Sequence, residues 1–108
     1  MSDRIEALLA MLEKSPDDVL LNYSLGMEYS SAGHYAQAVE RFQKCIDLDG
    51  DYIAAYVEAG KALRSAGELQ EAREMLAAGM ELAARGGESH VRDYIQQQLD
   101  SLPKDDKT

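Results

Sequence analysis

A motif that returns at a fixed interval constrains this chain more than any other feature. Leu25-Gly26 returns as Ala59-Gly60, and Phe42 returns as Leu76. A fixed period of roughly 34 residues is typical of stacked repeats, in which each unit buries its apolar face only against its neighbours. The pattern therefore predicts a repeat architecture, and it favours a protein that holds other molecules over one that transforms them.

The spacing of apolar residues predicts that the units are helical. Over 35–48, for example, Ala38, Phe42 and Cys45 fall on one side of a helix. Ser15 is expected to cap the second helix, and Gly33 is expected to end it with a positive φ. The helices that we expect lie over about 2–14, 17–31, 35–48, 51–65, 68–85 and 88–102.

Two glycines occur inside predicted helices, at Gly26 and Gly60. Glycine in a helix interior costs about 1 kcal/mol relative to alanine. The recurrence of that cost at the same repeat position indicates a packing reason. We expect another helix to approach the backbone closely at both glycines.

Two phased copies of a single motif cover the middle of the chain. In the first copy the motif residues are Leu25, Gly26, Tyr29, Gly33, Tyr35, Ala38, Phe42 and Cys45, and in the second they are Tyr56, Ala59, Gly60, Leu63, Gly67, Ala72, Leu76 and Gly79. These residues resemble the tetratricopeptide repeat family, whose repeating unit is a helical hairpin. Asn22 departs from that motif because an aromatic residue is usual at its position, and Gly50 replaces the usual closing proline.

The resemblance implies an all-α, right-handed superhelix of about six antiparallel-stacked helices. The segment 2–14 fits the second half of a unit, two full units follow, and 88–102 fits a first half that caps the stack. We expect residues 1–102 to form a single domain of this kind, as in a small bacterial protein, and residues 103–108 to form a disordered charged tail.

The resemblance also implies a concave groove, lined by the first helix of each unit, that binds a peptide or protein segment. Carried over to this chain, the groove residues are Leu20, Tyr23, Ser24, Met27, Ser30, Ala54, Val57, Glu58, Lys61, Arg64 and Arg92, with Gln98 as a further candidate from the last helix. Tyr23 and Met27 would be adaptable anchors, and the basic residues favour an acidic group on the ligand. The alternative is that these are ordinary solvated helix positions.

Some members of the family hold a chaperone's C-terminal carboxylate with a lysine and asparagine clamp. Met27 and Glu58 stand where such asparagines are expected, which disfavours that ligand. The competing hypothesis is self-association without a groove ligand, through Tyr52, Tyr56 or the apolar stripe of the last helix. The chain would then be a structural homodimer, and the sequence allows either a monomer or a weak homodimer.

The composition of the chain limits the kinds of partner that it can bind. The formal net charge of −9 disfavours nucleic acid and anionic membrane surfaces, and no apolar run approaches the roughly 20 residues of a membrane span. Cys45 is the single cysteine and falls on an apolar helix face, which predicts a core residue in a reducing, cytoplasmic compartment.

The sequence offers no constellation for catalysis. His34 falls in a turn and His90 near the start of the last helix, and neither has a second His or Cys at a ligand spacing. No glycine-rich phosphate loop is present, since Gly33 and Gly67 are single helix stops. We therefore expect no metal, no cofactor and no enzymatic activity, and a protein or peptide of unknown identity as the partner.

Overall fold

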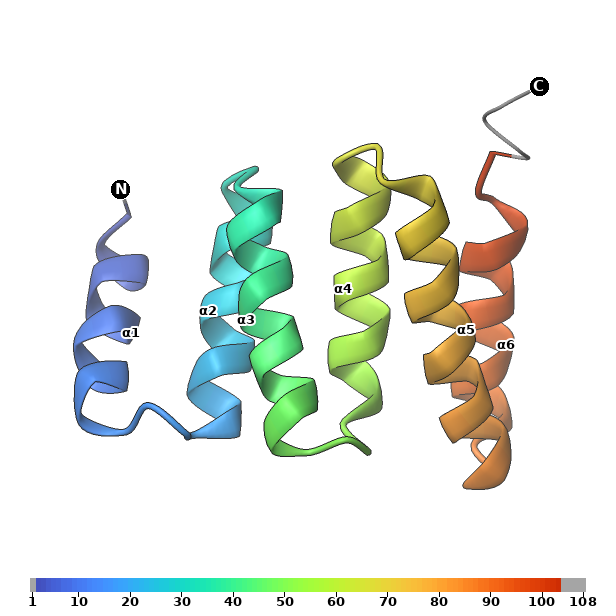
Figure 1. Cartoon of the computed structure of the whole chain (residues 1–108), viewed down its shortest axis with the longest axis horizontal. Coiled ribbons are helices and arrows are strands. Elements are labelled where there is room, and N and C mark those ends of the chain that lie inside the picture. Colours follow the sequence, from blue (N-terminus) through green and yellow to red (C-terminus); the bar gives the residue numbers. More distant parts are fainter. Residues whose placement is uncertain (1, 104–108) are drawn as a thin grey trace.

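The structure is a computed structural model in which residues 2–103 are described, and this part of the chain is all α-helical. Six helices follow one another in a row (Figure 1). Their bounds are α1 Asp3–Lys14, α2 Val19–Ser31, α3 Tyr35–Leu48, α4 Ile53–Ser65, α5 Leu69–Arg85 and α6 Ser89–Asp100. The predicted six helices and the all-α repeat fold are confirmed. Apart from Pro103, the expected tail lies outside the described residues.

Consecutive helices run antiparallel and pack side by side, so that α1 lies at one end of the row and α6 at the other (Figure 1). The molecule is flattened, with extents of 42 × 33 × 19 Å. Besides these sequential contacts, α2 also contacts α4. The first helices of the two central hairpins are therefore neighbours, as stacking of whole units requires.

The two central hairpins keep the period of the sequence motif. The starts of α2 at Val19 and of α4 at Ile53 are offset by the same interval that separates Phe42 from Leu76. The last helix departs from this period, since a constant interval would place its start before Ser89, where α6 begins. The cause is the length of α5, which has 17 residues where α3 has 14. Positions in α6 consequently do not follow the register of the repeat.

Close packing at the two helix-interior glycines explains why they recur. A Cβ atom placed on Gly26 would lie 2.6 Å from Cε1 of Phe42, and one placed on Gly60 would lie 2.6 Å from Cγ of Leu76. Real carbon atoms pack about 3.5–4.0 Å apart, so neither position has room for a side chain. The large residue of the second helix occupies the notch left by the glycine, as expected from the sequence.

Glycine also follows the ends of α2 and α4. Gly33 has a φ of 83° and Gly67 a φ of 85°, the left-handed region that residues with a Cβ atom rarely adopt.

The predicted N-cap of α2 at Ser15 is wrong, because Ser15 closes the end of α1 instead. The N-cap of α2 is Asp18, whose Oδ1 accepts the backbone N–H of Leu21 at 2.9 Å. The carboxylate satisfies a free amide of the first turn and also carries the charge that a helix N-terminus favours.

The hydrophobic core is formed by the buried faces of the six helices. Phe42, Leu25 and Leu76 are almost completely buried, and the packed residues run from Ile5 in α1 to Ile95 in α6.

Cys45 belongs to this core. It is fully buried, and its Sγ contacts the carbonyl oxygen of Val19 at 3.5 Å. Burial raises the pKa of its thiol to about 11. The predicted core role of Cys45 is therefore supported by its surroundings.

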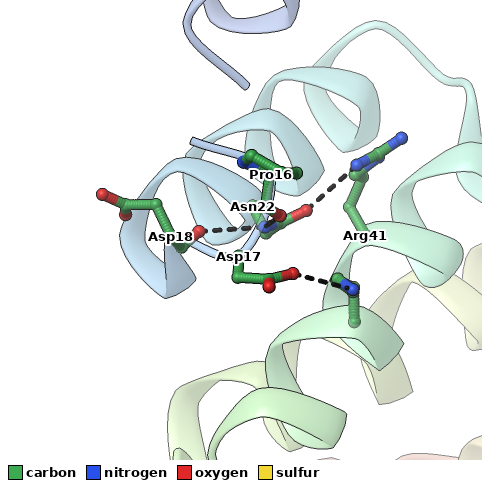
Figure 2. Close-up of polar contacts among 6 residues, drawn as sticks. Pro16, Asp17, Asp18, Asn22 and Arg41 are labelled. Carbon is green, nitrogen blue, oxygen red and sulfur yellow. Dashed lines mark hydrogen bonds and ion pairs between the residues drawn. The ribbon is translucent and has the colours of Figure 1, made fainter. Parts of the chain in front are cut away.

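Asn22 is fully buried, although it stands at the position where the sequence lacks the usual aromatic residue. Its Nδ2 donates to the carbonyl oxygens of Pro16 at 3.1 Å and Asp18 at 2.9 Å, and its Oδ1 accepts from Arg41 at 3.0 Å (Figure 2). Both donor hydrogens and the acceptor are thus used, as a buried amide requires. Asn22 fixes the α1–α2 loop onto α2 and ties α2 to α3.

The second unit contains the same loop contact, made by a different residue. Tyr56 occupies the repeat position of Asn22, and its hydroxyl donates to the carbonyl oxygen of Gly50 at 2.7 Å. Gly50 in turn occupies the repeat position of Pro16. The repeat therefore preserves a bond from this helix position to the preceding loop, and an amide replaces the aromatic hydroxyl in the first unit.

Candidate functional site

The surface shared by α2 and α4 contains a hollow of about 280 Å³. It lies where the C-terminal halves of the two helices meet the start of α3, at Tyr35. Four predicted groove residues line it, namely Met27 and Ser30 from α2 and Glu58 and Lys61 from α4. The remaining lining residues were not predicted, and they are Ser31, Tyr35, Ala62 and Ser65.

Lys61 is held in place by neighbours on both sides. Its Nζ lies 3.6 Å from Oε2 of Glu58, donates to the hydroxyl of Tyr94 at 3.0 Å and lies 5.6 Å from the centre of that ring. The hydrogen bond with Tyr94 raises the pKa of Lys61, and the carboxylate of Glu58 adds to the rise. The hollow therefore contains a protonated amine whose charge is offset by an adjacent carboxylate.

Arg64 lies further along α4 and contacts the end of the stack. Its Nη1 donates to Oγ of Ser101 at 2.9 Å and lies 3.4 Å from Oε1 of Gln98. Together with Lys61 it ties α4 to α6, while α6 packs against α5 and continues the row (Figure 1). The last helix thus extends the stack instead of lying across the hollow.

The sequence pattern predicts that Arg92 contributes to this surface from α6. In the structure, the α6 residue that contacts Lys61 is Tyr94. Arg92 instead lies beside Asp93, with 3.7 Å between Nη2 and Oδ1. Tyr94 was missed because the expected position in α6 assumed a constant period, which the longer α5 breaks. The signal that could have found it is the greater predicted length of the helix over 68–85 than of the helix over 35–48, which shifts the register of the last helix.

The other predicted positions differ in how much surface they offer. Leu20 is 63% exposed at the start of α2, whereas Val57 is only 6% exposed and packs in the core. Ser24 is half-buried.

Tyr23 has a packing role as well as an accessible edge. Its ring packs against Phe42 and Tyr52, with centroid distances of 5.7 and 5.4 Å. Burial raises the pKa of its hydroxyl. Tyr23 is therefore only in part available to a ligand.

A family model described as tetratricopeptide repeat matches residues 29–90, more than half of the chain. The chain belongs to the tetratricopeptide repeat family. It is similar to the TPR repeat-containing protein PA0015 of Pseudomonas aeruginosa, with 39% identity over 87 residues that cover 81% of this chain and 83% of the relative.

Solved structures superpose on the chain over most of its length. The solution structure of protein BPP2914 from Bordetella parapertussis matches with a TM-score of 0.82 and 29% identity, covering 94% of this chain and 89% of that one. A tetratricopeptide repeat domain protein from Salinibacter ruber has a TM-score of 0.70 at 24% identity, with 78% and 85% of the two chains covered. The second likeness concerns the fold alone.

Tetratricopeptide repeat proteins generally act by binding other proteins, and they are generally not enzymes. Within residues 2–103, no three His, Cys, Asp or Glu side chains come together as a metal site would need. No helix in the same part of the chain is long and apolar enough to cross a membrane.

Proposed function

We propose that this protein binds a segment of another protein along the surface formed by α2 and α4. The hollow of about 280 Å³ between these helices carries the proposal, because it brings an apolar side chain, Met27, together with Glu58 and Lys61. A flexible thioether beside a few fixed polar groups suits an adaptable contact with a peptide. The identity of the bound protein is not part of the proposal.

The predicted groove residues divide into three roles. Leu20 and Met27 supply apolar contact, while Tyr23 and Val57 support the wall from the core side. Ser24 adds a half-buried hydroxyl beside them. The polar contacts come from Glu58, Lys61 and Arg64, while Arg92 pairs with Asp93 and has no role in the proposal.

The charges favour one orientation of the ligand. Lys61 is balanced by Glu58, whereas Arg64 contacts the neutral groups of Gln98 and Ser101 within the described residues. Within residues 2–103, Arg64 therefore has no carboxylate partner, and it lies on the exposed side of α4. We expect a carboxylate of the bound segment to lie towards Arg64, and an apolar side chain of the segment to lie on Met27.

The test is affinity capture from a lysate of the native cell with the wild type and two double variants. Met27→Ala with Arg64→Gln should lose the captured partner, since it removes the apolar and the cationic contact. Met11→Ala with Arg85→Gln makes the same chemical changes at exposed positions on α1 and α5, and it should retain the partner. Equal capture by both variants would refute the assignment of this surface.

Self-association is the competing function. Two of the tyrosines that it would use are engaged within the chain, Tyr52 with the ring of Tyr23 and Tyr56 with the carbonyl of Gly50. Sedimentation equilibrium over a wide concentration range separates the two functions, because a monomer throughout removes the homodimer. We keep the cytoplasm as the proposed compartment, since the buried, unpaired Cys45 needs no oxidising environment.

A further inference from the structure

A second hollow, of about 340 Å³, lies between the second helices of the two central hairpins, α3 and α5. It shares no lining residue with the hollow between α2 and α4. Its apolar lining comes from Val39, Leu63, Met75 and Ala78, and its acidic lining from Glu71 and Glu74. The volume is at the lower end of the range of about 300–1,000 Å³ that is usual for ligand pockets.

The internal repeat shows that two lining residues of this hollow differ from their counterparts in the preceding unit. Ala78 occupies the repeat position of Lys44, and Leu63 occupies that of Tyr29. In the preceding unit these positions thus carry longer side chains, and Lys44 extends to Asp17, with 3.3 Å between Nζ and Oδ1. The second unit has shorter, apolar residues at the same places, and they form part of the apolar lining of the hollow.

The charge around this floor is negative and locally unbalanced. No Lys, Arg or His lines the hollow, and neither Glu71 nor Glu74 forms an ion pair within residues 2–103. A hydrogen bond with Glu68 raises the pKa of Glu71, and the negative charges of Glu68 and Glu74 raise it further. Carboxylates crowded in this way are stabilised by a cation that approaches from outside.

We propose that the hollow between α3 and α5 is a second docking site, which binds a partner segment carrying one aliphatic side chain flanked by Lys or Arg residues. The aliphatic side chain occupies the floor at Met75 and Ala78, and the basic residues pair with Glu71 and Glu74. The partner is a basic segment of a different protein, since the net charge of −9 and the two carboxylates at the hollow attract positively charged chains.

The chain's own last residues do not have this chemistry. Residues 104–108 read Lys-Asp-Asp-Lys-Thr and contain no large apolar side chain for the floor. Deletion of 104–108 provides a direct check. If the deletion moves the amide resonances of Met75 and Ala78 in the absence of any peptide, the tail is the occupant and the proposal is overturned.

The probe for the proposed site is a short, labelled, alanine-rich peptide with one central leucine between pairs of lysines. Two matched peptides carry serine in place of the leucine, or glutamate in place of the lysines. At low ionic strength the first peptide should bind with a Kd below about 1 mM and shift the amide resonances of Glu74, Met75 and Ala78. Absence of binding, equal binding of a matched peptide, or shifts confined to Met27 and Lys61 would overturn the proposal.

Variants of the protein test the two halves of the site separately. Ala78→Gln fills the hollow with a neutral side chain that favours helix, and it should raise the Kd of the peptide at least about tenfold. The double variant Glu71→Gln with Glu74→Gln should raise the Kd of the peptide about fivefold. Glu13→Gln with Glu81→Gln removes the same two charges at exposed positions of α1 and α5, and it serves as the control.

The outcomes are decisive even if one variant does not fold. Melting curves identify a loss of structure in Ala78→Gln, and the surface changes at Glu71 and Glu74 then carry the test alone. An equal effect of the two glutamine pairs would show that only the net charge matters, which contradicts a defined site. Binding that survives in a folded Ala78→Gln variant would contradict the role of the floor.

Discussion

Replacement of Gly26 by alanine tests the packing on which the whole stack depends. The added Cβ would lie 2.6, 2.8 and 2.9 Å from Cε1, Cδ1 and Cζ of Phe42. Since carbon atoms prefer separations of about 3.5–4.0 Å, the ring would have to retreat by about 1 Å. A shift of the ring must displace its neighbours, because Phe42 is fully buried and its ring packs against Tyr23.

Two opposing terms set the expected magnitude. Overpacking of a buried site costs about 1–3 kcal/mol, and alanine gains about 1 kcal/mol over glycine in a helix interior. Because three ring atoms are involved, we expect the overpacking term to prevail and the free energy of unfolding to fall by about 1–2 kcal/mol. For a chain of this size that corresponds to a Tm roughly 5–10 °C lower.

Urea denaturation followed by far-ultraviolet circular dichroism measures the change, with Gly50→Ala as the control. A Cβ on Gly50 would meet only the carbonyl oxygen of Ile46 at 3.9 Å, and its φ is not positive, so that variant should be neutral or slightly stabilised.

A double-mutant cycle with Phe42→Ala isolates the contact between the two residues. In the Phe42→Ala background the overpacking is absent and only the helix propensity changes. Gly26→Ala should therefore raise the free energy of unfolding by up to about 1 kcal/mol. The coupling between the two positions would then be about 2–3 kcal/mol. A stabilising effect of Gly26→Ala in the wild type, or the same effect in both backgrounds, would refute the reasoning.

Three further predictions concern single residues. The Cys45 thiol, with its pKa near 11, should react with a disulfide reagent at pH 8 roughly 100-fold more slowly in the folded than in the unfolded chain, as absorbance kinetics would show. Asn22→Ala should lower the free energy of unfolding by about 2–3 kcal/mol in chemical denaturation, since it removes from a fully buried position both the donor to the Pro16 carbonyl and the acceptor for Arg41. Gly67→Ala should cost about 1 kcal/mol in the same assay, because its φ of 85° strains any residue with a Cβ although space is available; no loss would mean that the turn relaxes.

The candidate site could be predicted from the sequence only as far as the repeat stays regular. Met27, Glu58 and Lys61 lie in the two regular units, and all three line the hollow between α2 and α4. Tyr94 lies beyond them, and the greater length of α5 (17 residues against 14 in α3) disturbs the register of α6.

The exposure of a groove position also could not be predicted. Val57 and Leu20 were both expected to face the groove, but they differ greatly in burial. Exposure depends on which side chains of the neighbouring helices cover a position, and a single helix face does not contain that information.

Buried polar contacts were similarly outside the reach of the sequence. Asn22 was noticed only as a departure from the usual aromatic residue, and nothing in the pattern indicated its bonds to Pro16 and Asp18. The choice of Asp18 over Ser15 as the helix cap depended on where the chain leaves α1. Both residues are capable caps, so local chemistry alone did not discriminate between them.

The sequence by itself determined the helices, their order and the closeness of their packing. Those properties depend on short-range periodicity, and the glycines at 26 and 60 leave a notch for the large residue of the following helix. The tertiary structure alone decided which side chains meet across different helices, including Lys61 with Tyr94 and the floor between α3 and α5. Such contacts depend on the lengths of the intervening helices and the volumes of several side chains together, which no single repeat position encodes.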